Sequence, residues 1–310
     1  MKLLRAIFLG VRGVPEGTYE FANTTNGKPH DLIVITGPEA SGKTRFLEAL
    51  LATKEAVGGY GPPSPGATWL TPNGTLAKVV LSFALSDEER AYVGTSQAVV
   101  DGEATFIGDR VRRDADEGLV ALLARYEHGH ATGKVEYFPA SRRLSPLGPF
   151  HGTGELEQRM VRATKEPTKY GFVVRFLREL PFRAADRSAF AALLQSLSPT
   201  CRYLDGEPVT GLPRCFSSRG IGPVLASELS ETEQHAVLLA ATAVTIGLSH
   251  SLILLDRPEL STSPTGAAAF VKALGALGAD NQVILASAAT EIIAAVPRDC
   301  VLTLDGGASG

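Results

Sequence analysis

The sequence has few of the features that mark several classes of protein. Its 310 residues include only three cysteines, Cys201, Cys215 and Cys300, which are too few and too scattered to predict a disulfide framework or a zinc site. No charge of one sign dominates, because 30 lysines and arginines stand against 33 acidic residues, and this excludes a global basic signature for nucleic acid. No uncharged apolar run approaches the ~20 residues needed to cross a bilayer, and residues 1–13 lack the apolar core of a signal peptide. These absences predict a cytoplasmic protein.

What the sequence does contain is the composition of a globular protein, with 44% hydrophobic and 20% charged residues. Its length suffices for one large domain or two small ones. Continuous apolar runs predict strands buried on both faces, whereas alternating or helically spaced apolar residues predict half-buried strands and helices. The strands expected are 2–11, 18–21, 32–35, 76–85, 96–107 (as a pair), 135–138, 252–255, 283–286 and 301–304; helices are expected after residue 44 and over 116–126, 232–246 and 267–277, with a polar turn at 86–89.

One segment between an expected strand and an expected helix matches a phosphate-binding motif, the P-loop, in full. Gly37-x-x-x-x-Gly42-Lys43-Thr44 follows the apolar run 32–35 and precedes a helical pattern. The glycines let backbone N–H groups wrap a phosphate, and the start of the helix adds a favourable dipole. We expect Lys43 to neutralise the β- and γ-phosphates and Thr44 to coordinate Mg²⁺. The predicted nucleotide-binding residues are Gly37, Pro38, Glu39, Ala40, Ser41, Gly42, Lys43 and Thr44.

A second group of motif residues lies nearer the C-terminal end of the sequence. The apolar run 252–255 ends in Asp256, and P-loop proteins use such a carboxylate to hold Mg²⁺. Upstream, residues 229–234, Leu-Ser-Glu-Thr-Glu-Gln, lead into an expected apolar helix. Alone, Ser-x-x-Glu before such a helix predicts an ordinary capping box. That interpretation remains open beside a role in nucleotide binding.

The order of these motifs resembles that of compact bacterial ABC-class, AAA-type ATP-binding proteins of the SMC, recombination-repair and OLD-like groups. The segments Gly-Val-Arg-Gly at 10–13, Tyr-Phe-Pro-Ala-Ser-Arg at 137–142 and Pro-Arg-Asp at 297–299 are similar as well. The resemblance implies an α/β fold, namely a P-loop NTPase of ABC-ATPase type with an antiparallel β portion. It also implies a single nucleotide-binding domain over 1–310, with a helical lobe inserted at 139–225.

The resemblance further implies ligands and partners. ATP and Mg²⁺ would be the cofactors, with Thr44 and Asp256 as metal ligands. ATP would lie between two heads that meet as a homo- or hetero-oligomer, with the signature residues Ser230, Glu233 and Gln234 of one head facing the P-loop of the other. Ser230 would then contact the γ-phosphate from the start of its helix. A partner protein or DNA is also expected, and a membrane is not.

Three positions depart from the pattern of this family, and each of them affects hydrolysis. Arg257 follows Asp256 where the family has a glutamate that polarises the attacking water, and arginine cannot accept a proton. Ala288 stands where the family has a histidine, and Thr232 takes the place of a signature glycine. Glu259 is the remaining candidate for a catalytic base.

These departures predict a nucleotide-dependent assembly switch with weak or absent hydrolysis, and the resemblance suggests a role in DNA repair or phage defence. The alternative is an active ATPase that works with a partner subunit or a nuclease. A P-loop kinase is disfavoured, because kinases do not need a signature segment ahead of the strand that ends in Asp256.

Other sequence features give weaker indications. Gln97 is a candidate for the family's Q-loop glutamine and also fits a solvent-facing strand residue. The segment 128–130, His-Gly-His, favours a surface turn over a metal site. Between 139 and 190, ten lysines and arginines stand against five acids, which predicts a solvated helical face and leaves a nucleic-acid or acidic-protein surface as the alternative. In the same stretch, Arg142 or Arg143 could face a nucleotide or a partner.

Overall fold

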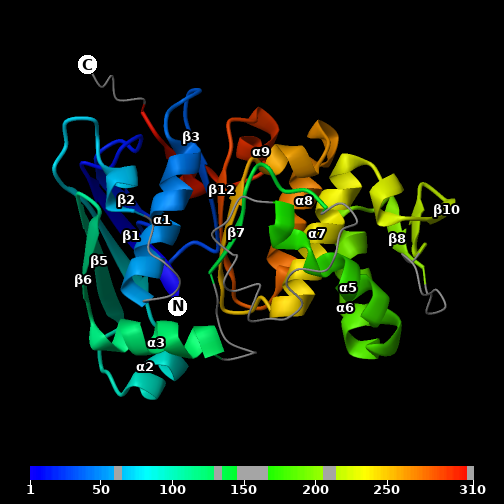
Figure 1. Cartoon of the computed structure of the whole chain (residues 1–310), viewed down its shortest axis with the longest axis horizontal. Coiled ribbons are helices and arrows are strands. Elements are labelled where there is room, and N and C mark those ends of the chain that lie inside the picture. Colours follow the sequence, from blue (N-terminus) through cyan, green and yellow to red (C-terminus); the bar gives the residue numbers. More distant parts are fainter. Residues whose placement is uncertain (59–64, 129–134, 145–166, 205–213, 306–310) are drawn as a thin grey trace.

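Two kinds of strand in the sequence build two kinds of sheet. In this computed structural model, which describes residues 1–58, 65–128, 135–144, 167–204 and 214–305, one large sheet is antiparallel and the other is parallel. A small third sheet and most of the helices lie on the far side of the parallel sheet (Figure 1). The parallel sheet therefore runs through the middle of the molecule.

The antiparallel sheet has the strand order β2-β1-β4-β5-β6. Its strands are β1 (Lys2–Leu9), β2 (Gly17–Glu20), β4 (Ala77–Ala84), β5 (Val99–Ile107) and β6 (Arg110–Ala115). Alternate residues of β5 are buried, as expected of a sheet with one solvated face. The buried face packs on helix α1 (Lys43–Gly58), which lies between this sheet and the parallel one (Figure 1).

The parallel sheet has the strand order β13-β3-β12-β11-β7. Its strands are β3 (Leu32–Thr36), β7 (Val135–Phe138), β11 (Leu252–Asp256), β12 (Gln282–Ala286) and β13 (Val301–Thr303). Every residue of β11 and β12 is buried, because other layers cover both faces of this sheet. Parallel strands end at the same edge, so the P-loop after β3 and Asp256 at the end of β11 come together there.

The two faces of the parallel sheet belong to two different cores. Ile33 and Leu254 pack toward α1 and the antiparallel sheet, whereas Val34 and Leu255 pack toward the other helices. Those helices are α5 (Phe172–Glu179), α6 (Ala184–Leu197), α7 (Glu231–Ile246), α8 (Ala267–Leu274) and α9 (Thr290–Ala294). Beyond them lies the small antiparallel sheet of β8 (Cys201–Tyr203), β9 (Phe216–Ser218) and β10 (Ile221–Val224) (Figure 1).

Short 3-10 helices connect these elements. They are η1 (Gly66–Trp69), η2 (Pro167–Tyr170), η3 (Leu180–Phe182), η4 (Ala226–Glu228), η5 (Pro258–Ser261), η6 (Pro264–Gly266), η7 (Gly275–Leu277) and η8 (Arg298–Cys300). In the parts of the chain described here, no helix is long and apolar enough to span a bilayer.

Most of the predicted elements are confirmed, including α3 (Glu117–His128), and three differ. The polar turn predicted at 86–89 is wrong: Ser86 and Glu89 form a capping box that begins helix α2 (Asp87–Val93). The stretch predicted as a strand pair holds the single strand β5, and its partner β6 follows it. The lobe predicted over 139–225 is helical at α5 and α6, but it also contains the small sheet, which the sequence did not predict. Residues 145–166 of that lobe lie outside the described residues.

Candidate functional site

The P-loop connects β3 to α1, and its two glycines permit its shape. Gly37 (φ 147°) and Gly42 (φ 94°) both have backbone conformations that favour glycine. A Cβ atom on Gly42 would lie 1.9 Å from the carbonyl oxygen of Gly13, and a Cβ atom on Gly37 would lie 2.4 Å from that of Leu304. The loop is therefore held closely between the segment after β1 and the end of β13, directly before the start of α1.

Lys43, the first residue of α1, places its ammonium group in the P-loop. Its Nζ donates to the carbonyl oxygens of Gly37 (2.9 Å) and Pro38 (2.6 Å) and to the hydroxyl of Ser41 (3.4 Å). These three acceptors are neutral, so they orient the ammonium group without cancelling its charge. A positive charge at the start of a helix is a favourable site for phosphate.

Thr44 and Asp256 come from different ends of the sequence and meet beside the P-loop. The Thr44 hydroxyl lies 3.0 and 2.9 Å from the two carboxylate oxygens of Asp256. Asp256 is only 3% exposed, and burial raises the pKa of its carboxyl group, although the hydrogen bond from Thr44 opposes this shift. A carboxylate and a hydroxyl are oxygen ligands that suit Mg²⁺, and a cation would offset the cost of burying the carboxylate. These two residues therefore fit a Mg²⁺ ion.

These residues line a single cavity of about 1010 Å³, which is large enough for a nucleoside triphosphate. Its lining consists of Arg12, Gly13, Glu39, Ala40, Gly42, Lys43, Thr44, Arg45, Thr68, Asp256, Arg257, Glu259, Ala286, Ser287 and Ala288. Five of the eight predicted nucleotide-binding residues are among them. The other three are Gly37, Pro38 and Ser41, which bind the Lys43 ammonium group.

Glu259 lies in the same cavity, on the short helix η5. Its Oε2 accepts a hydrogen bond of 2.7 Å from the Ser287 hydroxyl, and its Oε1 lies 3.7 Å from Nε of Arg257. Arg257 has a left-handed backbone conformation (φ 50°), and the chain turns there between β11 and η5. Ala288, which follows Ser287, adds only a methyl group to the lining. The structure thus brings the predicted base Glu259 to the cavity. Asp256 and Arg257 line the same cavity.

Arg142 is buried beneath this site, so it does not face a nucleotide or a partner. Its guanidinium donates to the carbonyl oxygens of Pro139 (3.0 Å), Asp256 (2.7 Å) and Arg257 (2.9 Å). It also donates twice to the Ser261 hydroxyl, at 3.1 and 2.6 Å. These bonds tie the end of β7 to the turn after β11 and fix the backbone on both sides of the Asp256 carbonyl. Nothing in the sequence predicted this positioning role beyond a Ser-Arg pair after a strand.

Two further arginines add positive charge to the cavity. The Arg45 guanidinium lies 3.8 Å from the centre of the Trp69 ring and donates to the carbonyl oxygens of Arg12 (3.2 Å) and Thr68. Arg12 and Arg45 both line the cavity near the P-loop. Arginine binds phosphate and stacks on planar groups, so this pair extends the binding surface beyond the motif. The sequence marked Arg12 only as part of segment 10–13 and gave no signal for Arg45.

The predicted signature residues form a separate structure at the start of α7. Ser230 and Glu233 make the capping box that was the alternative interpretation: the Glu233 N–H donates to the Ser230 hydroxyl (3.4 Å), and the Ser230 N–H donates to the Glu233 carboxylate (3.1 Å). Glu233 also accepts hydrogen bonds from Ser218 (2.8 Å) and Thr200 (3.1 Å), which join α7 to the small sheet. Gln234 donates to the backbone before the helix at 2.8 Å. None of the three signature residues is among the described residues that line the cavity.

Gln97 is exposed in the loop before β5 and is not among the described cavity residues. The segment 128–130 falls largely outside the described residues. Within the basic stretch 139–190, Lys169 is buried and pairs with Glu136 at 2.6 Å, so together with Arg142 it removes two cations from the predicted solvated face. The basic residues at 159, 162 and 165 lie outside the described part of the chain.

Comparisons with known proteins bear on the fold. No protein-family model matches the chain, and no curated protein matches it in sequence. Among solved structures, an SMC head bound to the C-winged helix domain of ScpA has a TM-score of 0.60 at 13% identity, over 97% of this chain and 96% of that chain. An SMC head with an extended coiled coil, bound to the C-terminal domain of ScpA derived from Pyrococcus furiosus, has a TM-score of 0.56 at 13% identity, over 97% and 94%.

A third similar structure is that of RecF, the recombination mediator protein of the RecFOR pathway. Its TM-score is 0.50 at 10% identity, over 97% of both chains. All of these likenesses extend over nearly the whole chain, and they agree with the mixed sheets and the strand–P-loop–helix arrangement described above. The expected fold is confirmed: this chain has the ABC-class ATPase fold of SMC heads and RecF.

Proposed function

We propose that this chain is an ATP-binding module in which Mg·ATP promotes assembly with a second head or another protein, with little or no hydrolysis. The observation that carries the proposal is a contrast within one cavity. Lys43, Thr44 and Asp256 offer an ammonium group, a hydroxyl and a carboxylate in this cavity, which supports nucleotide and Mg²⁺ binding, whereas Arg257 follows Asp256 directly. Arginine has no acceptor for a proton, and loss of a general base costs ~10²–10⁴-fold in rate.

The assembly part of the proposal rests on linkage. A ligand that binds the assembled state more tightly than the separate chains shifts the equilibrium toward assembly. Ser230 is exposed at the start of α7, where it could meet the ATP held by another chain. Two of the similar SMC heads are bound to parts of ScpA, which supports a partner protein for this chain. Action in the cytoplasm, in DNA repair or in phage defence belongs to this proposal as an inference from resemblance.

A second candidate function is that of an active ATPase that works with a partner subunit or a nuclease. The specific observation in its favour is that Glu259 lines the cavity with its carboxylate held by Ser287 at 2.7 Å. Glu259 would then be the group that activates water in place of the residue at 257.

The experiment that separates these functions measures mass and phosphate release on the same samples. We expect light scattering to show a larger assembly with Mg·ATP than with Mg·ADP or no nucleotide, and phosphate release no higher than that of Lys43→Ala. The variant Ser230→Arg should bind ATP and fail to assemble. Its matched control is Ser86→Arg, because Ser86 caps α2 through the same kind of capping box.

Two results would overturn the proposal. If Mg·ATP binds and the mass stays unchanged at every protein concentration tested, the chain is not an assembly switch of this kind. If wild-type protein releases phosphate and Lys43→Ala abolishes the release, the second candidate is correct.

A further inference from the structure

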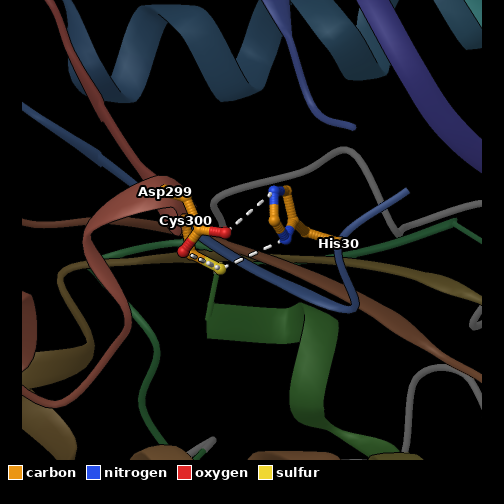
Figure 2. Close-up of side chains that lie close together, drawn as sticks. All are labelled: His30, Asp299 and Cys300. Carbon is orange, nitrogen blue, oxygen red and sulfur yellow. Dashed lines mark hydrogen bonds and ion pairs between the residues drawn. The ribbon is translucent and has the colours of Figure 1, made fainter. Parts of the chain in front are cut away.

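A second group of reactive side chains lies where the parallel strands begin, at the end of the sheet opposite the P-loop. Strands β3 and β13 are parallel neighbours, with Val34 beside Val301, so the segments that precede them enter the sheet at the same end. His30 lies before β3, and Asp299 and Cys300 lie before β13 (Figure 2). The Cys300 sulfur is 3.3 Å from Nδ1 of His30 and 3.9 Å from Oδ1 of Asp299.

These three side chains supply a nitrogen, a sulfur and an oxygen donor at distances suited to one metal ion. One donor atom from each residue can be chosen so that all lie within 4.8 Å of one another. In a tetrahedral zinc site, the usual Zn–S and Zn–N bond lengths separate sulfur and nitrogen by about 3.6 Å. The observed separation of 3.3 Å between the Cys300 sulfur and Nδ1 of His30 differs from this by only a few tenths of an ångström.

We propose that His30, Asp299 and Cys300 form a Zn²⁺ site with three protein ligands and one position left for water. Zinc binds cysteine, histidine and carboxylate ligands together, and three protein ligands with an open position is a common arrangement. On binding, the Cys300 thiol gives up its proton to solvent and the thiolate bonds to the metal.

Surrounding groups already hold two of the three ligands, Asp299 and His30, in place. Nδ2 of Asn23 donates to Oδ2 of Asp299 at 3.2 Å, which leaves Oδ1 to face Cys300. The buried Gln282 side chain donates to the His30 carbonyl oxygen at 3.0 Å, and the His30 N–H donates to the carbonyl oxygen of Phe21 at 2.9 Å. Such outer contacts orient metal ligands and tune their affinity. The thiol is buried and the carboxylate is half-exposed, so a metal ion has a path from solvent.

A metal ion at this site would join β3 and β13, the two strands whose other ends contact the P-loop. Beyond β13, the Leu304 N–H donates to the carbonyl oxygen of Thr36 at 2.7 Å, and the Leu304 carbonyl closely approaches Gly37. A metal that joins the beginnings of β3 and β13 therefore stabilises the pair of strands whose other ends hold the loop. The inference does not depend on whether the chain hydrolyses ATP.

The test is metal binding by the full chain, purified without a metal-affinity tag and stripped with a chelator. We expect one Zn²⁺ per chain by metal analysis, and a Co²⁺ complex with a thiolate-to-metal charge-transfer band that zinc displaces. Cys300→Ser should lose the band, and Asp299→Asn and Asn23→Ala should each weaken binding about tenfold or more. The matched control is Cys201→Ala, which removes another buried thiol, in the small sheet, and should leave the band unchanged.

The design keeps the inference open to refutation even if one variant folds poorly. Circular dichroism checks each variant, and the change at the half-buried Asn23 leaves all three ligands in place. The proposal is overturned if wild-type protein binds no zinc, if its Co²⁺ complex lacks the thiolate band, or if the band persists in Cys300→Ser. Co²⁺ bound without the band would mean that the metal is held by groups other than Cys300, such as those of the nucleotide cavity, whose described lining contains no cysteine.

Discussion

On one wall of the cavity, the P-loop, Thr44 and Asp256 supply the groups to which we assign nucleotide and Mg²⁺ binding; on the other, Arg257 and Ala288 stand where the family that the sequence resembles has a glutamate and a histidine. The first wall is called the binding wall here, and the second wall, formed by Arg257, Glu259 and Ala288, is called the hydrolysis wall. The two walls lie at the same end of one sheet, where β3, β12 and β11 end, and Arg142 donates to the backbone carbonyls of Asp256 on the first wall and Arg257 on the second. They nevertheless differ in their side chains: the first wall has the groups expected to bind the nucleotide, and the second lacks two of the groups expected for hydrolysis.

Under the proposed function, a few side chains on the hydrolysis wall separate binding from hydrolysis. Arg257 keeps its place in the fold, because its N–H donates to the carbonyl oxygen of Ala286 at 2.9 Å and its own carbonyl accepts from Arg142. These bonds involve only backbone atoms of residue 257, so the side chain is free to change. The hydrolysis wall is therefore the part of the site where substitutions should be informative without loss of folding.

The largest expected effect is on the binding wall, with Lys43→Ala. Removing the ammonium group should weaken Mg·ATP binding by about 100-fold or more, because hydrogen bonds between charged groups are each worth ~1.5–3 kcal/mol. Calorimetric titration measures the affinity. The matched control is Lys272→Ala, which removes the same charge from an exposed position on α8. Equal affinities for the two variants would show that the P-loop does not bind the nucleotide.

The next effect tests the hydrolysis wall through Arg257→Glu. This change places a carboxylate directly after Asp256, and we expect phosphate release to rise about 10- to 100-fold, part of the ~10²–10⁴-fold that a positioned base contributes. Arg257→Gln is the control, because it removes the positive charge without adding a base. A rise of the same size in both variants would mean that the arginine inhibits by its charge, and that a missing base is not the reason for slow hydrolysis.

Glu259→Gln tests whether the carboxylate that remains on the hydrolysis wall acts as a base. If Glu259 has no catalytic role, the variant keeps the phosphate release of wild-type protein while ATP affinity changes less than about threefold. The Gln side chain can still accept the hydrogen bond from Ser287, so the local structure should hold. A loss of release by more than tenfold, with affinity unchanged, would identify Glu259 as the base and contradict the assembly-switch proposal.

The sequence predicted much of this site and left specific parts of it out. The buried runs 32–35 and 252–255 have the pattern expected of strands covered on both faces, and the P-loop spacing is local, so the sequence was enough to predict the binding wall. Arg142 could not, because its partners are backbone carbonyls brought together only by folding. The pair His30 and Cys300 lies 270 residues apart in sequence, and no spacing rule connects such residues.

The smallest expected effect lies on neither wall, at Glu233. Glu233→Gln should reduce the free energy of unfolding by about 1 kcal/mol at neutral pH, because the carboxylate accepts hydrogen bonds from Ser230, Ser218 and Thr200. Urea unfolding measures the change. The control Glu228→Gln alters a half-exposed pair with Arg214 and should change stability by less than about 0.5 kcal/mol.

The stability that Glu233 contributes depends on pH. Burial raises the pKa of the Glu233 carboxyl group, but the hydrogen bonds from Ser230 and its neighbours outweigh burial and lower the pKa below the ordinary value of 4.5. The folded state therefore favours the charged form, and the stability that Glu233 contributes is full above pH 4.5 and is lost as pH falls through the lower folded pKa. Wild type and Glu233→Gln should converge in stability on acidification, with ATP affinity at neutral pH unchanged. A stability difference independent of pH would assign the effect to packing, and a loss of ATP affinity in the isolated chain would mean that the start of α7 acts on its own binding wall.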